Sequence, residues 1–100
     1  MIEHIVLFKW KEEALPQQID LALNALKELK NKIPGIVEIS CGKNFSERNQ
    51  GFQSALIVRF NDTDSLKAYF PHPEHQKVVE NNIKPILLDI LSIDYQDISG

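Results

Sequence analysis

The sequence is poor in the residues that would indicate a disulfide scaffold, a flexible linker or a basic binding surface. Its 100 residues include one cysteine, four glycines and five prolines, and the net charge is −3. Cys41 alone can form neither an internal disulfide nor a zinc site, so we expect a reducing compartment, the cytoplasm. The acidic balance disfavours nucleic acid and anionic membranes as partners, because both attract a basic face.

Long hydrophobic runs, internal repeats and low-complexity segments are also missing. The apolar opening, residues 1–8, is too short to cross a bilayer or to act as a signal peptide. Hydrophobic residues make up 43% and charged residues 25%, which is typical of a globular chain. We expect a single domain over residues 1–100, because a chain of this length supplies one core.

Hydrophobic periodicity predicts four strands and three helical segments. In residues 2–11, His4, Val6 and Phe8 share one face of a strand while Ile5 and Leu7 occupy the other. The predicted elements that follow are a helix from Pro16 to about Ile33, strands 36–43 and 52–60, a short helix capped by residues 61–64 and ending at Phe70, a helix from Pro73 to about Asn82, and a strand 91–98.

This order, β-α-β-β-α-α-β, predicts an α+β fold of the ferredoxin-like type, in which helices cover one face of a four-stranded antiparallel sheet. The first strand is apolar on both faces, so the uncovered face would expose a large apolar patch. We therefore expect a homodimer packed through the sheets, burying more than roughly 1,000 Å² in total.

The segment YFPHPEH, residues 69–75, concentrates titratable side chains between two prolines. If Pro73 is the first helical residue, His72 is the N-cap and His75 lies in the first turn. The positive end of the helix and burial both disfavour a charged imidazole, so His75 should be neutral at pH 7 and able to act as a base. Tyr69 could donate a hydrogen bond to a carbonyl oxygen beside it.

Other interpretations of these residues stay open. His4 could be a satisfied core histidine with a partner such as Asp94 on another strand. His72 and His75 are spaced for one helical face, yet zinc needs three or four ligands, so we predict no metal. We also predict no cofactor, since no haem motif is present. Cys41 is expected to pack as a small hydrophobe.

The chain also resembles the stress-responsive A/B barrel (Dabb) family of the dimeric α+β barrel superfamily. The matching segments lie in order along the chain: HIVLFKWK at 4–11, IPGI at 33–36, GKN at 42–44, GF at 51–52, Tyr69 with HPEH at 72–75, and DY at 94–95. The resemblance implies a dimer whose two sheets close into a barrel.

Many members of this family have no assigned activity, but one is a plant cyclase that closes a polyketide ring by aldol chemistry. The resemblance to it implies that His75 is the base, that Tyr69 holds the substrate and that His4 lines the pocket. Ser54 stands where the cyclase has a further histidine, so a different substrate is expected.

Two functional hypotheses result. The first is a pocket between sheet and helices for a small apolar carbonyl or aromatic compound, with cyclase- or lyase-like acid–base chemistry by His75 and Tyr69. The residues expected to contact the ligand are His4, Val6, Phe8, Ser54, Leu56, Val58 and His72. The second is a non-catalytic, stress-protective or scaffolding dimer in which the same polar residues only stabilise the corner.

Overall fold

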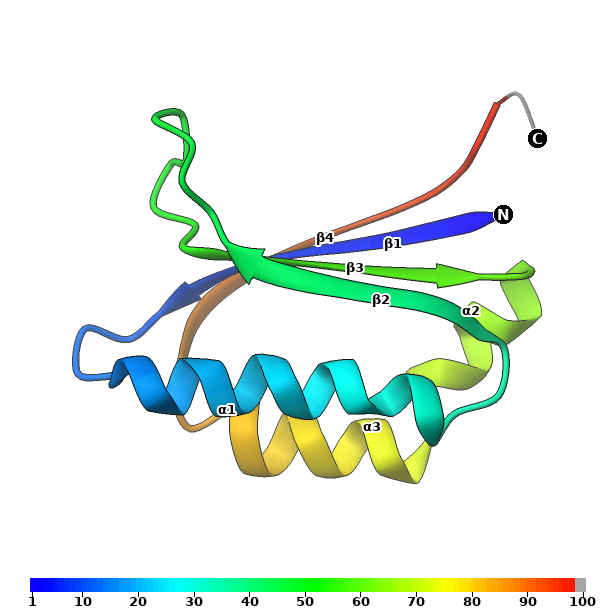
Figure 1. The fold of residues 1–100 in the computed structure, drawn as a ribbon, viewed down its shortest axis with the longest axis horizontal. Coiled ribbons are helices and arrows are strands. Elements are labelled where there is room, and N and C mark those ends of the chain that lie inside the picture. The colour runs from blue at the N-terminus through cyan, green and yellow to red at the C-terminus, as the bar shows by residue number, and fades with distance from the viewer. Residues whose placement is uncertain (99–100) are drawn as a thin grey trace.

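The computed structural model describes residues 1–98 and arranges them as one sheet with helices on one of its faces (Figure 1). In chain order the elements are β1 (Ile2–Trp10), α1 (Pro16–Lys27), the 3₁₀ turn η1 (Glu28–Asn31), β2 (Ile36–Lys43), β3 (Ser54–Phe60), α2 (Thr63–Tyr69), α3 (Pro73–Val78), the π-helical turn η2 (Val79–Ile83) and β4 (Leu87–Gln96). The predicted ferredoxin-like α+β plan is confirmed.

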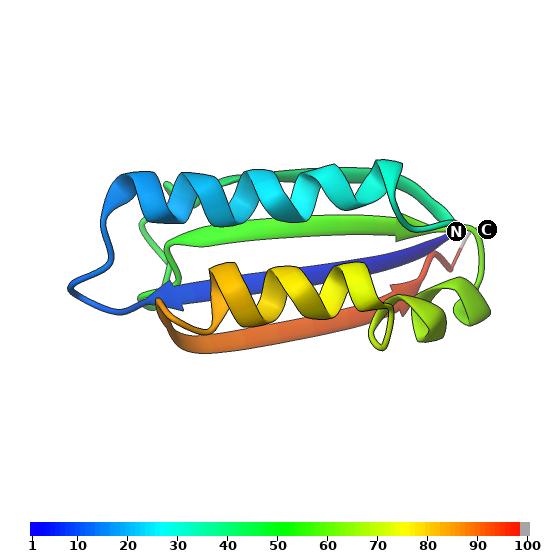
Figure 2. The ribbon, with the colours of Figure 1, turned by 90° about the horizontal axis from the view of Figure 1, so that it is seen from below.

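The sheet has the strand order β2-β3-β1-β4 and is antiparallel throughout. Figure 2 shows α1 lying over β2 and β3, while α3 and η2 lie over β1 and β4. Val6 pairs with Leu56 of β3 on one side and with Ser92 of β4 on the other. The two central strands are therefore β1 and β3, and β4 is an edge strand.

Several predicted boundaries were wrong, and the two largest differences lie on either side of Pro85. The third strand begins at Ser54 rather than at residue 52, and the last strand ends at Gln96 rather than at residue 98. The last strand begins at Leu87 rather than at residue 91, because Pro85 lies in the turn before the strand and Lys11 N–H already donates to the Ile86 carbonyl at 2.8 Å. The predicted helix 73–82 is regular only to Val78 and continues as the wider turn η2. A π turn places an extra residue in the helix, and hydrophobic spacing does not reveal it.

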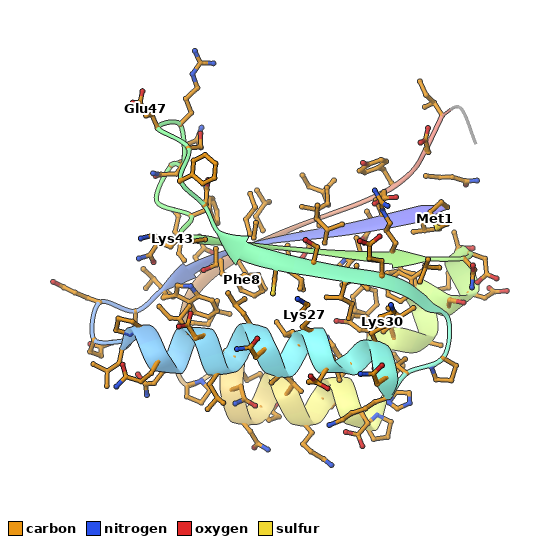
Figure 3. All side chains as sticks on the ribbon, in the orientation of Figure 1. Met1, Phe8, Lys27, Lys30, Lys43 and Glu47 are labelled. Atoms are coloured by element: carbon orange, nitrogen blue, oxygen red, sulfur yellow. The ribbon has the colours of Figure 1, made fainter. Side chains whose placement is uncertain are left out.

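The core lies between the sheet and the helices. His4, Val6, Phe8 and Trp10 all point into this layer and are at most 5% exposed, as the alternation in the first strand predicted. Figure 3 shows Phe8 in the space between the sheet and α1. The buried hydrophobic residues are Ile2, Val6, Phe8, Trp10, Ala22, Leu23, Leu26, Leu29, Ile33, Ile39, Leu56, Val58, Phe60, Leu66, Tyr69, Val78, Ile83 and Ile86.

The other face of the sheet, which we call the outer face, has no helix over it among the described residues. Its centre is formed by Ile5, Leu7, Ile57, Leu91 and Ile93. Ile57 is 37%, Leu91 45% and Ile93 47% exposed in the single chain. Large exposed apolar surfaces of this kind mark interaction sites in folded proteins.

The turn at Gly35 limits what can occupy that position. Gly35 has φ +92°, and an added Cβ would lie 2.6 Å from Ser65 Oγ and 2.7 Å from Ser65 Cβ. We expect Gly35→Ala to lower the free energy of unfolding by about 1–3 kcal/mol, because it combines a left-handed backbone with a clash. Asparagine tolerates positive φ better but carries the same Cβ, so Gly35→Asn should destabilise the protein as well. Urea unfolding at one fixed protein concentration checks both, and an unchanged midpoint for Gly35→Ala would contradict the expectation.

Candidate functional site

The corner between α2 and α3 is held by hydrogen bonds of its own residues. His72 is the N-cap of α3, and its Nδ1 accepts from the Glu74 backbone N–H at 3.1 Å. The His72 N–H donates to the Tyr69 carbonyl at 3.2 Å, and Pro73 occupies the first turn. The predicted capping role of His72 is confirmed, and the corner brings Tyr69 next to His75.

His75 has one ring nitrogen committed to the backbone. Its Nδ1 lies 3.0 Å from the Phe70 carbonyl oxygen, which can only accept a hydrogen bond, so Nδ1 carries the proton. In the neutral ring, Nε2 then holds the free lone pair. Burial lowers the pKa of His75 below its ordinary 6.5, and the charges of His4 and His72 lower it further, although the hydrogen bond to Phe70 opposes them. The imidazole is therefore neutral at pH 7.

Tyr69 is 1% exposed, and its ring centroid lies 4.3 Å from that of His75. No hydrogen bond of its hydroxyl is found among residues 1–98, and no fully buried side-chain polar atom in this part of the chain lacks a partner. The hydroxyl therefore borders accessible space. Burial raises the pKa of Tyr69 well above its ordinary value, so the phenol stays protonated and can donate.

His4 reaches the same space from β1. Its Nδ1 lies 2.5 Å from Asp94 Oδ1 on the neighbouring strand β4, which is the partner that the sequence suggested. Its ring centroid is 5.9 Å from that of Tyr69 and 5.3 Å from that of Phe70. The carboxylate accepts from Nδ1–H and so fixes the tautomer and orientation of a histidine whose side chain is 5% exposed.

The side chains of His75, Tyr69 and His4 border one cavity of about 320 Å³. It lies between the sheet and the helical segment formed by α2, α3 and η2. This volume is at the small end of the range for ligand pockets in proteins. The lining residues are His4, Val6, Phe8, Leu26, Leu56, Tyr69, Phe70, His75, Val79, Ile83, Lys84, Leu87, Ile90 and Ser92. The wall is mainly apolar, and the imidazoles and the phenol meet at one end of it.

Six of the predicted site residues are brought together here, and three are not. Ser54 instead accepts a hydrogen bond from Trp10 Nε1 at 2.9 Å and lines a different cavity. Val58 has no exposed surface and lies in the core, and His72 caps α3. Ser54 and Val58 do lie on the predicted face, but α1 rather than α3 and η2 lies over that part of the sheet.

Sequence reasoning missed the residues that η2 and β4 contribute to the cavity. Val79 and Ile83 are four apart and face the sheet, and this spacing was the available signal. Ile90 and Ser92 alternate with the outer-face residues of β4, but the strand was predicted to begin after Ile90. The cavity lies between η2 and the strands, and the distance between these elements cannot be read from hydrophobic periodicity.

A second cavity of about 390 Å³ lies between α1 and the loop-side ends of β2 and β3, and Cys41 and Ser54 line it. It is larger, but it contains no histidine or tyrosine to act as a base or donor. Burial raises the pKa of the Cys41 thiol, opposed by the charge of Lys27, so the thiol is a poor nucleophile. His75 and Tyr69, the predicted base and donor, border the first cavity instead.

Residues 1–98 show neither a metal-binding cluster nor a membrane-spanning helix. No group of three histidine, cysteine or acidic side chains in this range is arranged to hold a metal ion. Each helix of the same range is too short or too polar to cross a membrane.

The fold and the cavity define a small ferredoxin-like α+β domain with a histidine-lined pocket. The model of the stress responsive A/B barrel domain family, Dabb, matches residues 2–97, so the chain belongs to this family. A stress-response A/B barrel domain-containing protein from Arabidopsis thaliana is 32% identical over 96 residues, covering 95% of this chain and 36% of that relative. Olivetolic acid cyclase from Cannabis sativa is 25% identical over 76 residues, covering 74% of this chain and 75% of the cyclase.

Solved structures agree with the fold. A crystal structure of an Arabidopsis thaliana protein has a TM-score of 0.90 at 24% identity, covering 100% of this chain and 98% of the other. A dimeric ferredoxin-like protein from Thermobifida fusca gives 0.81 at 26% identity, with coverage of 94% and 88%. Hydroxynitrile lyase from Passiflora edulis gives 0.85 at 22% identity, with coverage of 94% and 90%. The chain spans between about a third and a half of the two Arabidopsis relatives that it matches in sequence, at 36% and 46%.

The lowered pKa of His75 predicts that the free energy of unfolding depends on pH. Because the folded state holds the proton less tightly than the unfolded state, protonation below pH 6.5 favours unfolding. Wild type should therefore lose stability relative to His75→Gln when the pH falls from about 7.5 to about 5.5. Urea unfolding of both proteins at both pH values measures this, and comparing the two cancels the titration of other groups. A constant or opposite difference would show that His75 is not held neutral by the fold.

Proposed function

We propose that the histidine-lined cavity binds a small apolar carbonyl or aromatic compound and catalyses proton transfer at a carbon next to a carbonyl group. The observation that carries this proposal is the hydrogen bond from His75 Nδ1 to the Phe70 carbonyl, which leaves the Nε2 lone pair free beside the Tyr69 phenol. A neutral base and a protonated donor at one end of an apolar cavity are the two groups that enolate formation requires.

In this mechanism His75 Nε2 takes the proton from the α-carbon, and the electron pair of the broken C–H bond moves onto the carbonyl oxygen. The Tyr69 hydroxyl donates a hydrogen bond to that developing oxyanion. Among residues 1–98 this hydroxyl has no protein partner, so it need not give up another hydrogen bond to bind substrate. His4, oriented by Asp94, borders the same space and would orient the substrate. Phe8, Leu56 and Ile83 would hold the apolar part.

The relatives support this class of chemistry without naming a substrate. One relative in sequence is a cyclase, and one protein with the same fold is a hydroxynitrile lyase. The cyclase matches 74% of this chain, and the match at 25% identity extends over most of the cyclase itself. The same fold therefore accommodates enzymes, and the local geometry of His75 and Tyr69 makes this chain a candidate for one.

Hydrogen–deuterium exchange at the α-carbon tests the reaction without knowledge of the natural substrate. Acetophenone and 2-heptanone in deuterated buffer, followed by NMR, provide an aromatic and an alkyl probe. We expect wild type to accelerate exchange, His75→Gln to lose about 10²–10⁴-fold, and Tyr69→Phe to lose about 10²–10³-fold as for other oxyanion donors.

The matched control is Lys77→Gln, because Lys77 lies on the same helix α3 but its side chain is 64% exposed and does not line the cavity. It should leave the exchange rate unchanged. Equal rates in wild type and His75→Gln would exclude His75 as the base. Exchange at the buffer rate with every protein would favour the non-catalytic alternative.

That alternative, a stress-protective or scaffolding dimer, is supported by one observation. The Phe70 carbonyl accepts from His75 Nδ1 at 3.0 Å and from Gln76 Nε2 at 2.7 Å, so His75 also helps to hold the corner. On this hypothesis His75 contributes to stability and the cavity has no ligand. The exchange assay separates the two hypotheses.

We propose further that two copies of the chain pack through their outer faces, in a reducing compartment such as the cytoplasm, where Cys41 stays a free thiol. The support is the bare apolar centre of the outer face and the dimeric description of the Thermobifida fusca neighbour. In the single chain Tyr95 is 49% exposed at the end of this face. A second sheet is the surface of matching size and polarity.

Ile93→Asp tests the dimer, because it places a charge at the centre of the outer face. Sedimentation velocity over a dilution series should show a dissociation constant raised by about 100-fold or more, since an unpaired charge would be buried. Leu21→Asp is the control, because Leu21 is 62% exposed on α1, away from the outer face. Monomeric wild type, or an Ile93→Asp protein that associates normally, would contradict the proposed dimer.

A further inference from the structure

The loop between β2 and β3, residues 44–53, is long but internally fixed. Asn44 Oδ1 accepts from the Ser46 N–H at 3.0 Å, Ser46 Oγ accepts from the Arg48 N–H at 3.1 Å, and Asn49 Oδ1 accepts from the Gly51 N–H at 2.7 Å. Side-chain to backbone bonds of this kind replace a regular ladder. The loop therefore has a defined shape before anything binds to it.

This loop presents an aromatic side chain to solvent. Phe45 is 95% exposed, although the loop could have turned it toward the sheet. A neighbouring aromatic, Phe52, shows the contrast, because it is only partly exposed and Lys9 Nζ lies 4.7 Å from its ring centroid. An exposed phenylalanine on a preorganised loop is suited to contact another molecule at low entropic cost.

The position of the loop indicates which molecule that is. Figure 1 shows the loop rising from the sheet on the side away from the helices, at the same end as the start of β4. Figure 3 places Glu47 at its tip, above the outer face, whereas Phe8 lies on the opposite side of the sheet. Any protein that packs on the outer face comes within reach of the loop, and the occupant proposed for that face is a second copy of the chain.

The shape of the outer face indicates how the second copy is oriented. Along β4 the outer side chains are large, Leu91 and Ile93. Across the sheet, near the loop ends of β2 and β3, Ser40, Gly42 and Ala55 are small. Together with Lys43 and Ile57 they line a hollow of about 240 Å³. A two-fold axis parallel to the strands places the β4 edge of each copy over the hollow of the other, so that large side chains meet small ones.

The same axis determines what the loop meets. It keeps the direction of the strands, so the end of β2 in one copy lies beside the start of β4 in its partner. Near that start, Leu88 is 66% exposed and belongs to the irregular pairing between Lys9 and Trp10 of β1 and β4. We propose that the 44–53 loop is a dimer contact in which Phe45 packs against the partner's Leu88. This inference rests on the dimer proposed above.

A double-mutant cycle tests the contact by sedimentation velocity on the full chain. Phe45→Ser and Leu88→Ser should each weaken the dimer about tenfold, as loss of a well-packed apolar anchor does. The double variant should weaken it less than the product of the two single effects, because the same contact is removed twice. Leu21→Ser, an exposed leucine on α1, should leave the dissociation constant unchanged. Phe45 is exposed and the loop is held by other residues, so Phe45→Ser should fold normally.

Three other results of these measurements would contradict the proposal, each at a different step. Monomeric wild type would overturn both the dimer and the loop contact. Dimeric wild type with an unaffected Phe45→Ser variant would overturn the loop contact and leave the dimer in place. Multiplicative effects of the two substitutions would show that Phe45 and the partner's Leu88 do not meet, and would overturn the proposed orientation.

Discussion

The structure depends on a four-stranded sheet in which the central strand β1 is apolar on both faces, while helices cover only one face of the sheet. A sheet buries its backbone polar groups by pairing, but each apolar face needs a separate cover. On the helix side α1, α3 and η2 supply it, but they leave one cavity over β1 and β4 and another beside the ends of β2 and β3. The incomplete cover on one side leaves the cavity, and the missing cover on the other leaves the outer face.

Placing a histidine on the buried face of β1 requires a polar partner, because an unpaired imidazole inside a protein costs free energy. Asp94 meets this need from the adjacent strand and remains partly exposed at the sheet edge, with 42% of its side chain accessible. At the cavity the polar groups are only partly satisfied. Among residues 1–98, one ring nitrogen of His75, one ring nitrogen of His4 and the Tyr69 hydroxyl have no protein hydrogen bond, so water or a ligand can satisfy them.

The sequence predicted those parts of the molecule that local chemistry controls. The alternation of His4, Val6 and Phe8, the cap at His72 and the helix start at Pro16 each follow from a rule about neighbouring residues. The start of β4 was missed because Pro85 appeared to interrupt it, and the full lining of the cavity was missed because it depends on how η2 and β4 are arranged in space. Ser54 and Val58 were placed on the right face but not at the cavity, since distance along a strand does not tell how closely a helix packs above it.

The pairing of β4 with β1 has a consequence for the accuracy of folding. Successive residues of β4 serve opposite sides, since Ser92 and Asp94 face the cavity side and Ile93 and Tyr95 the outer face. A slip of one residue would exchange the two sets, sending a carboxylate into the apolar surface and an isoleucine against His4. The irregularity between Lys9 and Trp10 sets the alignment from one end of the ladder. The register of β4 on β1 therefore determines both the cavity and the outer face, and a shift of one residue would disrupt the two together.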